Sequence, residues 1–406
     1  SDDINNMETI HTANMVDDTT FTILGISEGT IRYYQVIVHD TYGYSTGSNV
    51  RQGISSNLWS NVYDDMENPD WGNSILEVDD GYWVTGVSNQ QMRLFKIDLS
   101  GNIISDQIIS NGYANEIISL EDGSLFLIGG AGAWNSSVQV IYKLDDSGNI
   151  LEGTDIESQY ASAWAYGAVV GPSSSPMLYV YGEMDGSAVI HSVSQSLGSS
   201  QELVYTDQQM HRVKDMIKID DGYVIASSNN EQTKIVKTDF DFNLTAQQTL
   251  DGYCRSINVT SDGNILLAMQ TGDPEHQLIK LNLATGVIYW EISADGIYNG
   301  FEVDDSYYAV GHHNGASLFM KLDISGNIIS SSSFGSGVIS DFSVTSDGGL
   351  VLTGTTSYWN DELSDTPVYK TDLNGTVNSR FNHRIVQGNS IIIPDMNNPD
   401  LNVRPF

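Results

Sequence analysis

The stretch KIDLSGNIIS, residues 96–105, returns 225 residues later as KLDISGNIIS, residues 321–330. Shorter versions of this pattern recur along the chain: a Lys, an Asp or Asn two residues later, and a turn rich in Gly and Asn. The lysines of the pattern are Lys96, Lys143, Lys237, Lys280, Lys321 and Lys370. A catalytic group is not needed six times, so we interpret the pattern as structural. The short Asp or Asn side chain can accept hydrogen bonds from the backbone of the turn.

A second repeated feature is an Asp-Gly turn between two short β-like runs. It lies at residues 80–81, 122–123, 221–222, 262–263 and 347–348, and Asp-Ser replaces it at 305–306. The steps are 42, 99, 41, 43 and 42 residues, so one degenerate copy fills residues 165–206. Asp-Gly is typical of a tight hairpin, because Gly adopts positive φ at little cost.

Each repeat therefore contains four short strands. The sequence predicts an all-β fold, a seven-bladed β-propeller of four-stranded antiparallel blades, over residues 56–381. Residues 58–65, LWSNVYDD, match an outer strand that has no blade before it, so we expect them to join the last blade and close the ring. Residues 382–406 form a C-terminal extended tail, for which an added strand, a clamp on the ring and a docking segment all stay open.

These repeats resemble those of bacterial exported propellers, which carry a DGG turn and a K-x-D-x-x-G-N turn in every blade. Residues 1–55 resemble the second half of a fibronectin type III domain, an Ig-like sandwich. Its corner matches at Ile26, Gly29 and Thr30, and its last hairpin at Asp40 and Gly43. We therefore predict a partial fibronectin type III module ahead of the propeller.

The pairing of these modules resembles surface or secreted proteins of Bacteroidetes-type bacteria. The first residues, SDD, are similar to the acidic export tag that follows a lipidated Cys in their surface lipoproteins. The resemblance implies an extracellular or outer-membrane location and a lipid anchor upstream of Ser1.

The net charge of the chain limits the classes of partner that it can bind. The chain has 17 Lys and Arg against 52 Asp and Glu, a net charge of -35. Such a field repels nucleic acid, so we expect no nucleic-acid partner. No apolar run of 18 residues exists, so we expect no membrane-spanning segment.

Motifs for catalysis or metal binding are absent from the sequence. The single cysteine, Cys254, excludes an internal disulfide, and the chain has no HExxH, GxSxG, Walker or GxGxxG motif. Asp239, Asp241 and Asn243 have the opening spacing of a calcium loop but lack its central Gly and closing Glu. We expect no catalytic residue, metal or cofactor, and calcium binding is left open without a motif.

Recognition is expected on one face of the ring. The Asp-Gly and Gly-Asn turns lie on one face, and the opposite face carries loops that differ in length and content. Stacking residues are expected there at the start of each blade, namely Trp71, Tyr113, Arg212 and Tyr253. Packing of these side chains between blades is the alternative. Aromatic candidates in the variable loops are Trp134, Tyr358 and Trp359.

These observations favour a non-catalytic binding or assembly protein. The propeller would be a recognition scaffold within a larger envelope complex, with a protein partner or a glycan as ligand. One alternative is a carbohydrate-active enzyme, a polysaccharide lyase or glycoside hydrolase, that uses the variable-loop face. The other is a purely structural subunit of an extracellular filament or envelope assembly.

Overall fold

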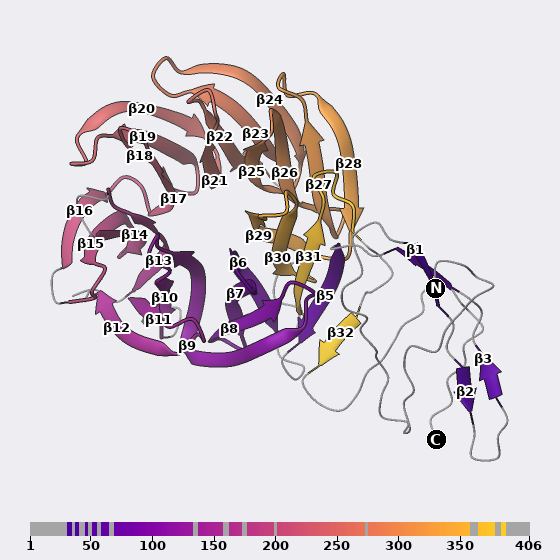
Figure 1. The fold of residues 1–406 in the computed structure, drawn as a ribbon. Helices are drawn as coiled ribbons and strands as arrows, with labels where there is room; N and C mark the ends of the chain where they lie inside the picture. The colour runs from indigo at the N-terminus through magenta and orange to yellow at the C-terminus, as the bar shows by residue number, and fades with distance from the viewer. Residues whose placement is uncertain are drawn as a thin grey trace.

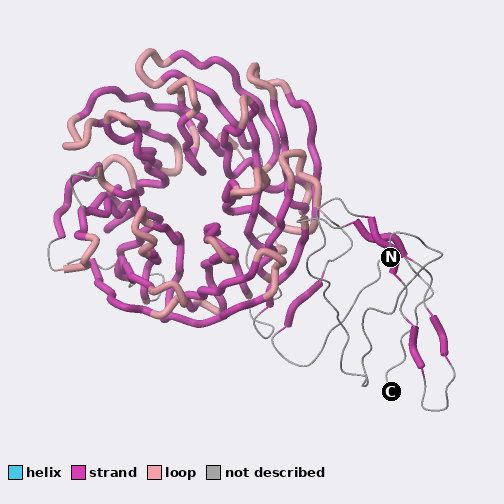
Figure 2. The backbone as a smooth tube through the Cα atoms, viewed as in Figure 1, coloured by secondary structure: helices cyan, strands magenta, loops and turns pink. Residues whose placement is uncertain are grey.

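The computed structural model shows antiparallel sheets arranged around one axis (Figure 1), with strands and turns throughout its described part (Figure 2). It describes residues 58–64, 69–132, 137–156, 162–172, 177–198, 201–272, 275–357 and 364–377, and the backbone of strands at 31–34, 37–39, 45–47, 51–54 and 383–386. The first strand of each sheet lies nearest the axis and the last lies at the rim, which is the architecture of a β-propeller. Within the described residues, no helix is long and apolar enough to cross a membrane.

Four sheets are separate four-stranded blades with the strands in chain order. They are β13 (Ala163–Val170), β14 (Met177–Met184), β15 (Ser187–Ser194) and β16 (Gln201–Asp207); β17 (Arg212–Ile219), β18 (Gly222–Ser228), β19 (Gln232–Thr238) and β20 (Leu244–Asp251); β21 (Tyr253–Val259), β22 (Ile265–Gln270), β23 (Glu275–Asn282) and β24 (Val287–Asp295); and β25 (Ile297–Val303), β26 (Ser306–His313), β27 (Ala316–Leu322) and β28 (Ile328–Phe334).

A fifth blade joins segments from both ends of the chain. Its order is β29 (Val338–Val344), β30 (Leu350–Thr355), β31 (Thr366–Thr371), β5 (Trp59–Asp64) and β32 (His383–Val386). β5 runs antiparallel to β31, and β32 adds a parallel strand outside β5. Residues 58–64 thus close the ring, and four residues of the predicted C-terminal tail extend the same sheet.

The remaining repeats form one continuous sheet of seven strands. They are β6 (Asp70–Val78), β7 (Gly81–Ser88), β8 (Gln91–Asp98), β9 (Ile103–Ser119), β10 (Leu125–Ala131), β11 (Val138–Leu144) and β12 (Ile150–Ile156). The first half of β9 pairs with β8 as an outer strand, and its second half pairs with β10 as an inner strand. The prediction of a seven-bladed propeller is therefore corrected: the described structure has five blades, and the other strands of the ring form one continuous sheet in which β9 pairs with both β8 and β10.

The shared strand continues through the junction at Asn111 and Gly112 because the backbone there is hydrogen-bonded to both neighbouring hairpins. Gly112 has a φ of 130° and pairs with Ala131 of β10, while Asn111 just before it pairs with Gln91 of β8. The N–H of Gly112 donates to Gln90 O at 2.8 Å, and the N–H of Gly132 donates to Asn111 O at 3.1 Å. Hydrogen bonding therefore continues across the junction and the strand does not end there.

The predicted fibronectin module falls almost entirely outside the described residues. Its described backbone comprises β1 (Ile31–Tyr34) paired with β4 (Arg51–Ile54), and β2 (Ile37–His39) paired with β3 (Ser45–Gly47). Both pairs are antiparallel. The assignment of residues 1–55 to this family stays a prediction.

The hydrophobic core lies between neighbouring sheets. One cluster joins Val224 and Ala226 of β18 to Cys254 and Ile257 of β21. Each blade alone has one face without a partner, so burial of apolar surface requires the ring as a whole.

The repeated Lys and Asp side chains are structural, as the sequence predicts. In four blades the lysine Nζ lies 2.6–2.8 Å from the Asp carboxylate of the hairpin turn: Lys96–Asp80, Lys237–Asp221, Lys280–Asp262 and Lys370–Asp347. Asp98 Oδ1 accepts the N–H groups of Ser100 and Asn102 at 2.9 and 2.8 Å. Asp239 binds the N–H groups of Asp241 and Asn243 in the same way. The calcium-like spacing is therefore that of a blade turn.

The glycine of the Gly-Asn turn also makes a contact between blades. Gly101 has a φ of 82°, and a Cβ there would lie 2.5 Å from Asn61 Nδ2 and 3.0 Å from the Trp59 ring. Gly148 and Gly326 approach Trp83 and Trp290 in the same manner. Gly is needed at this place both for positive φ and for close approach.

Candidate functional site

Every inner strand has a one-residue β-bulge at the same place. The inner strands are β6, the second half of β9, β13, β17, β21, β25 and β29. The bulged residues are Asn73, Asn115, Tyr166, Lys214, Arg255, Tyr298 and Ser340. A bulge re-aims the side chains around it. In β21 it lets Cys254 and Ile257 both enter the core, although strict alternation would place them on opposite faces.

The residue after the bulge ties one blade to the next. Its side-chain oxygen accepts a backbone N–H from the neighbouring inner strand, over distances of 2.7 to 3.5 Å. The pairs are Asp341 with Ile75, Ser74 with Ile117, Glu116 with Ala168, and Asp215 with Ile257. We call this set the inter-blade belt. Its repetition around the axis indicates a structural role.

Three belt carboxyl groups have raised pKa values. Desolvation inside the ring raises the pKa of Glu116 to about 8, and the charges of Asp215 and Asp341 add to the increase. Desolvation likewise raises the pKa values of Asp215 and Asp341 to about 6, although each accepts backbone hydrogen bonds that lower it. The belt is therefore partly protonated near neutral pH.

The bulged residues divide the ring into two unlike parts. Asn73 Nδ2 donates to Ala114 O at 2.9 Å, and Asn115 Nδ2 donates to Ala165 O at 2.6 Å. These short amides connect neighbouring inner strands. On the other side of the ring the bulges carry Tyr166, Lys214, Arg255 and Tyr298, which are large and half-buried.

These large side chains form an alternating row of rings and cations. Lys214 Nζ lies 4.4 Å from the centre of the Tyr166 ring and 5.3 Å from that of Tyr253. Arg255 Cζ lies 5.3 Å from the Tyr253 ring centre and 4.6 Å from that of Tyr298. We call Tyr166, Lys214, Tyr253, Arg255 and Tyr298 the aromatic–cation arc. It spans the inner strands of four consecutive blades.

The arc lies at the end of the ring that carries the variable loops. Tyr253 pairs with Gln270, which is the last residue of β22 before its connection to β23. Arg212 pairs with Ser228 at the corresponding end of β18. The arc is therefore next to the loops that the sequence assigns to recognition.

The cations change the acidity of Tyr253. Desolvation opposes ionisation of its hydroxyl, but Lys214, Arg212 and Arg255 outweigh this effect and lower the pKa of Tyr253. Arg212 Nε also lies 3.3 Å from Glu183 Oε2, which accepts the Tyr166 hydroxyl at 3.1 Å. The site thus holds a concentrated positive charge beside one carboxylate.

Two histidines extend the arc beyond Tyr298. The ring centres of His276 and His312 lie 5.5 and 5.7 Å from that of Tyr298. His276 Nδ1 accepts the N–H of Gly296 at 3.1 Å. Desolvation and the neighbouring His276 lower the pKa of His312, so the neutral imidazole is favoured there. Among the described residues, no group of three or more His, Cys, Asp or Glu is placed to hold a metal ion.

The structure brings together only some of the site residues that the sequence predicts. Arg212 and Tyr253 come together, with Arg212 Cζ 5.9 Å from the Tyr253 ring centre. Tyr113 instead packs edge-on against Trp164 of the next blade, with centres 5.1 Å apart. Trp71 is half-buried in β6, beyond the arc. Trp134, Tyr358 and Trp359 lie outside the described residues.

Sequence reasoning missed the arc residues at the bulges. Lys214, Arg255 and Tyr298 each lie eight positions before the hairpin Gly or its replacement, at Gly222, Gly263 and Ser306. That spacing is a usable signal, but regular strand alternation does not reveal the bulge that re-aims these side chains.

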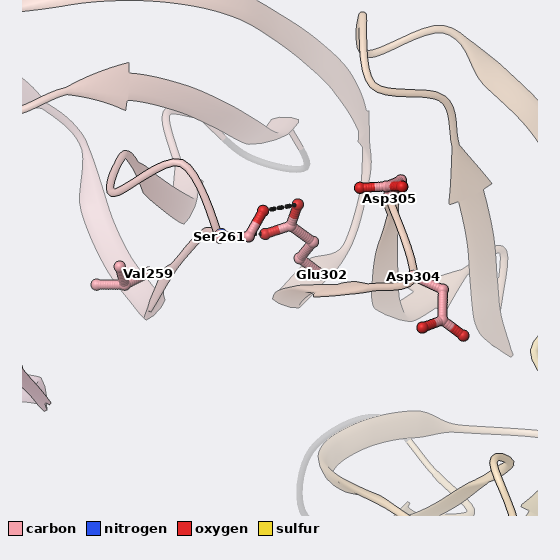
Figure 3. Close-up of a pocket in the computed structure, with 5 residues that line it drawn as sticks. All are labelled: Val259, Ser261, Glu302, Asp304 and Asp305. Atoms are coloured by element: carbon pink, nitrogen blue, oxygen red, sulfur yellow. Dashed lines mark hydrogen bonds between the residues drawn. The ribbon is translucent and has the colours of Figure 1, made fainter.

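A shallow pocket of about 490 Å³ lies on the opposite face, among Val259, Ser261, Glu302, Asp304 and Asp305 (Figure 3). Ser261 Oγ donates to Glu302 Oε1 at 2.9 Å. Ser346, in the turn between β29 and β30, makes the same contact with Glu77 of β6 at 3.1 Å. The Ser–Glu hydrogen bond recurs between neighbouring blades, so we interpret the pocket as a structural feature of the blade turns.

Comparisons with known proteins agree with the fold. No family model and no curated protein matches this chain. A solved structure described as the Dos1 propeller matches with a TM-score of 0.51 and 12% identity, covering 72% of this chain and 75% of its own. A protein of unknown function from Bacteroides caccae matches with a TM-score of 0.44 and 14% identity, covering 66% and 94%. At these identities the first likeness supports the propeller fold alone.

Proposed function

We propose that this chain is a non-catalytic recognition protein whose propeller binds its ligand at the aromatic–cation arc. The observation that carries the proposal is the convergence of Tyr166, Lys214, Tyr253, Arg255 and Tyr298 at the variable-loop end. Ring scaffolds commonly recognise ligands through residues held on rigid strands beside variable loops. Tyrosine and arginine are also among the side chains that are enriched in binding hot spots.

The setting is part of the same proposal. We infer an exported protein at the surface of a bacterium, acting within a larger envelope complex, with a glycan or a protein as ligand. The blade repeats and the fibronectin-like residues support this setting through their resemblance to exported bacterial propellers.

Binding to a broad glycan array and to extracted envelope proteins tests the proposal. Tyr253→Ala should remove binding, because it deletes the ring that Lys214 and Arg255 both contact. Tyr289→Ala is the matched control, since Tyr289 is 54% exposed on β24 of the same blade. Equal binding by the wild type and Tyr253→Ala would contradict the proposal.

A carbohydrate-active enzyme is the second candidate. The observation that favours it is Tyr253, whose pKa is lowered by surrounding cations, in an arc whose last ring, Tyr298, contacts two histidines. Such a tyrosine is suited to removing a proton from a sugar. Release of unsaturated or reducing sugar ends from acidic and neutral polysaccharides, lost in Tyr253→Phe, would favour this candidate over the non-catalytic one.

A further inference from the structure

We propose that the aromatic–cation arc recognises a sugar acid, that is, a sugar ring with a single carboxylate, and that Lys214 and Arg255 hold the carboxylate. This inference rests on the proposed function and names the ligand class of the same site. It follows from the pairing of the cations, the chemistry of the surrounding groups and the charge of the whole chain.

The first step concerns how the cations are paired. Arg93, Lys234 and Lys280 each contact a carboxylate at 2.6–2.8 Å, as do several other described cations. In the described part of the chain, no carboxylate lies within ion-pair distance of Lys214 or Arg255. Arg255 Nη2 donates to Gln270 Oε1 at 2.6 Å, which fixes the guanidinium and leaves further N–H donors. The chain has 52 acidic residues, yet these two neighbouring cations have no carboxylate partner among the described residues. They are therefore suited to bind an external anion.

The second step concerns the shape and polarity of the site. Tyr166, Tyr253 and Tyr298 are half-buried and share their ring faces with Lys214 and Arg255, and the part of each ring that stays exposed can contact the C–H groups of a sugar. Their hydroxyl groups, the Glu183 carboxylate and the Gln270 amide offer donors and acceptors for sugar hydroxyl groups. An acidic peptide would also need an apolar pocket for its side chains. The arc consists of tyrosines and cations, so it suits a sugar better than a peptide.

The third step limits the charge of the ligand. A net charge of -35 repels a polyanion as it approaches. Salt screens this field over roughly 8 Å at physiological ionic strength, whereas the cations of the arc act at contact distance. One carboxylate on an otherwise neutral sugar gains the local attraction with less long-range repulsion than a polyanion.

Binding of three small probes tests the inference: D-glucuronate, its neutral amide D-glucuronamide, and D-glucose. By isothermal titration or NMR titration, the wild type should bind glucuronate about tenfold or more tightly than glucuronamide, because the charge-assisted bonds require the carboxylate. Lys214→Gln and Arg255→Gln should each reduce this preference to about threefold or less. Lys218→Gln is the control for the loss of one charge on the same strand, and it should leave the preference unchanged.

The outcomes separate this inference from the proposed function. If glucuronate and glucuronamide bind equally, and Tyr253→Ala weakens both, the recognition site stands and the sugar-acid inference is overturned. Stronger binding of an acidic tripeptide than of glucuronate would also overturn it. If no probe binds and Tyr253→Ala changes nothing on the glycan array, both proposals fail.

Discussion

The hydroxyl of Tyr181 lies directly over Gly167: a Cβ on Gly167 would be 2.3 Å from that oxygen and 2.1 Å from Glu116 Oε2. Gly167 occupies the place after the bulge, where other inner strands carry a polar side chain of the inter-blade belt. Tyr181 of β14 supplies a hydroxyl there and donates it to Asp215 Oδ1 at 3.5 Å. The belt is thus continued by a residue from a different strand.

Gly167→Ala should lower the free energy of unfolding by about 2–3 kcal/mol, because the added methyl group displaces two buried polar groups. Urea unfolding measures the change. Gly198→Ala is the control, since its Cβ would meet nothing closer than Ser196 Oγ at 3.8 Å. Tyr181→Phe should restore part of the loss in the double variant. Equal stability of the two alanine variants would show that the belt tolerates the methyl group.

Glu116→Gln should flatten the dependence of stability on pH between about 5 and 9. The folded-state pKa of Glu116, about 8, lies above its ordinary value of 4.5, so the folded state binds the proton more tightly than the unfolded state. The stabilisation is full below about pH 4.5 and is lost as pH rises through 8. In the wild type this loss should be on the order of 3–5 kcal/mol, since each pH unit between 4.5 and 8 contributes about 1.4 kcal/mol. Thermal unfolding across this pH range measures it.

Exposed Glu152 on β12 provides the control for that experiment. Glu152→Gln removes the same charge without touching the belt, so its pH profile should follow that of the wild type. If Glu116→Gln has the same profile too, the raised pKa of Glu116 has no part in stability.

Tyr63→Phe should lower the free energy of unfolding by about 1–2 kcal/mol. Tyr63 of β5 is fully buried, and its hydroxyl donates to Gly101 O at 2.7 Å. The bond joins the ring-closing strand to the first Gly-Asn turn. Chemical denaturation of Tyr63→Phe and of the exposed control Tyr289→Phe measures the difference. A midpoint shared by both variants would exclude a stabilising role for this bond.

Cys254 should resist alkylation in the folded protein. The residue is 0% exposed, and burial raises the pKa of its thiol far above the ordinary value, so the reactive thiolate is absent. Mass spectrometry after iodoacetamide treatment should show no modification without urea and complete modification in urea. Rapid labelling of the native protein would show that β21 opens.

Some residues of the site could be predicted from the sequence, and others could not. Arg212 and Tyr253 could be chosen because their distance from the hairpin Gly marks the start of a strand. The same rule selected Tyr113, which packs against Trp164 instead. Trp164 belongs to the degenerate repeat, whose Asp-Gly pair at 185–186 lies between β14 and β15 instead of in the first hairpin. Spacing therefore identifies equivalent positions, but not which neighbour each side chain meets.

The sequence alone determined the repeating unit. Asp-Gly hairpins, the Lys–Asp pair and the Asp-capped Gly-Asn turn are local, because their partners lie within one blade and their backbone angles depend on a few residues. Only the tertiary structure decided how the units join. Sharing of β9 and the alternation of Tyr166, Lys214, Tyr253, Arg255 and Tyr298 depend on contacts between blades. Such contacts form only when the whole ring buries its core, so no single repeat encodes them.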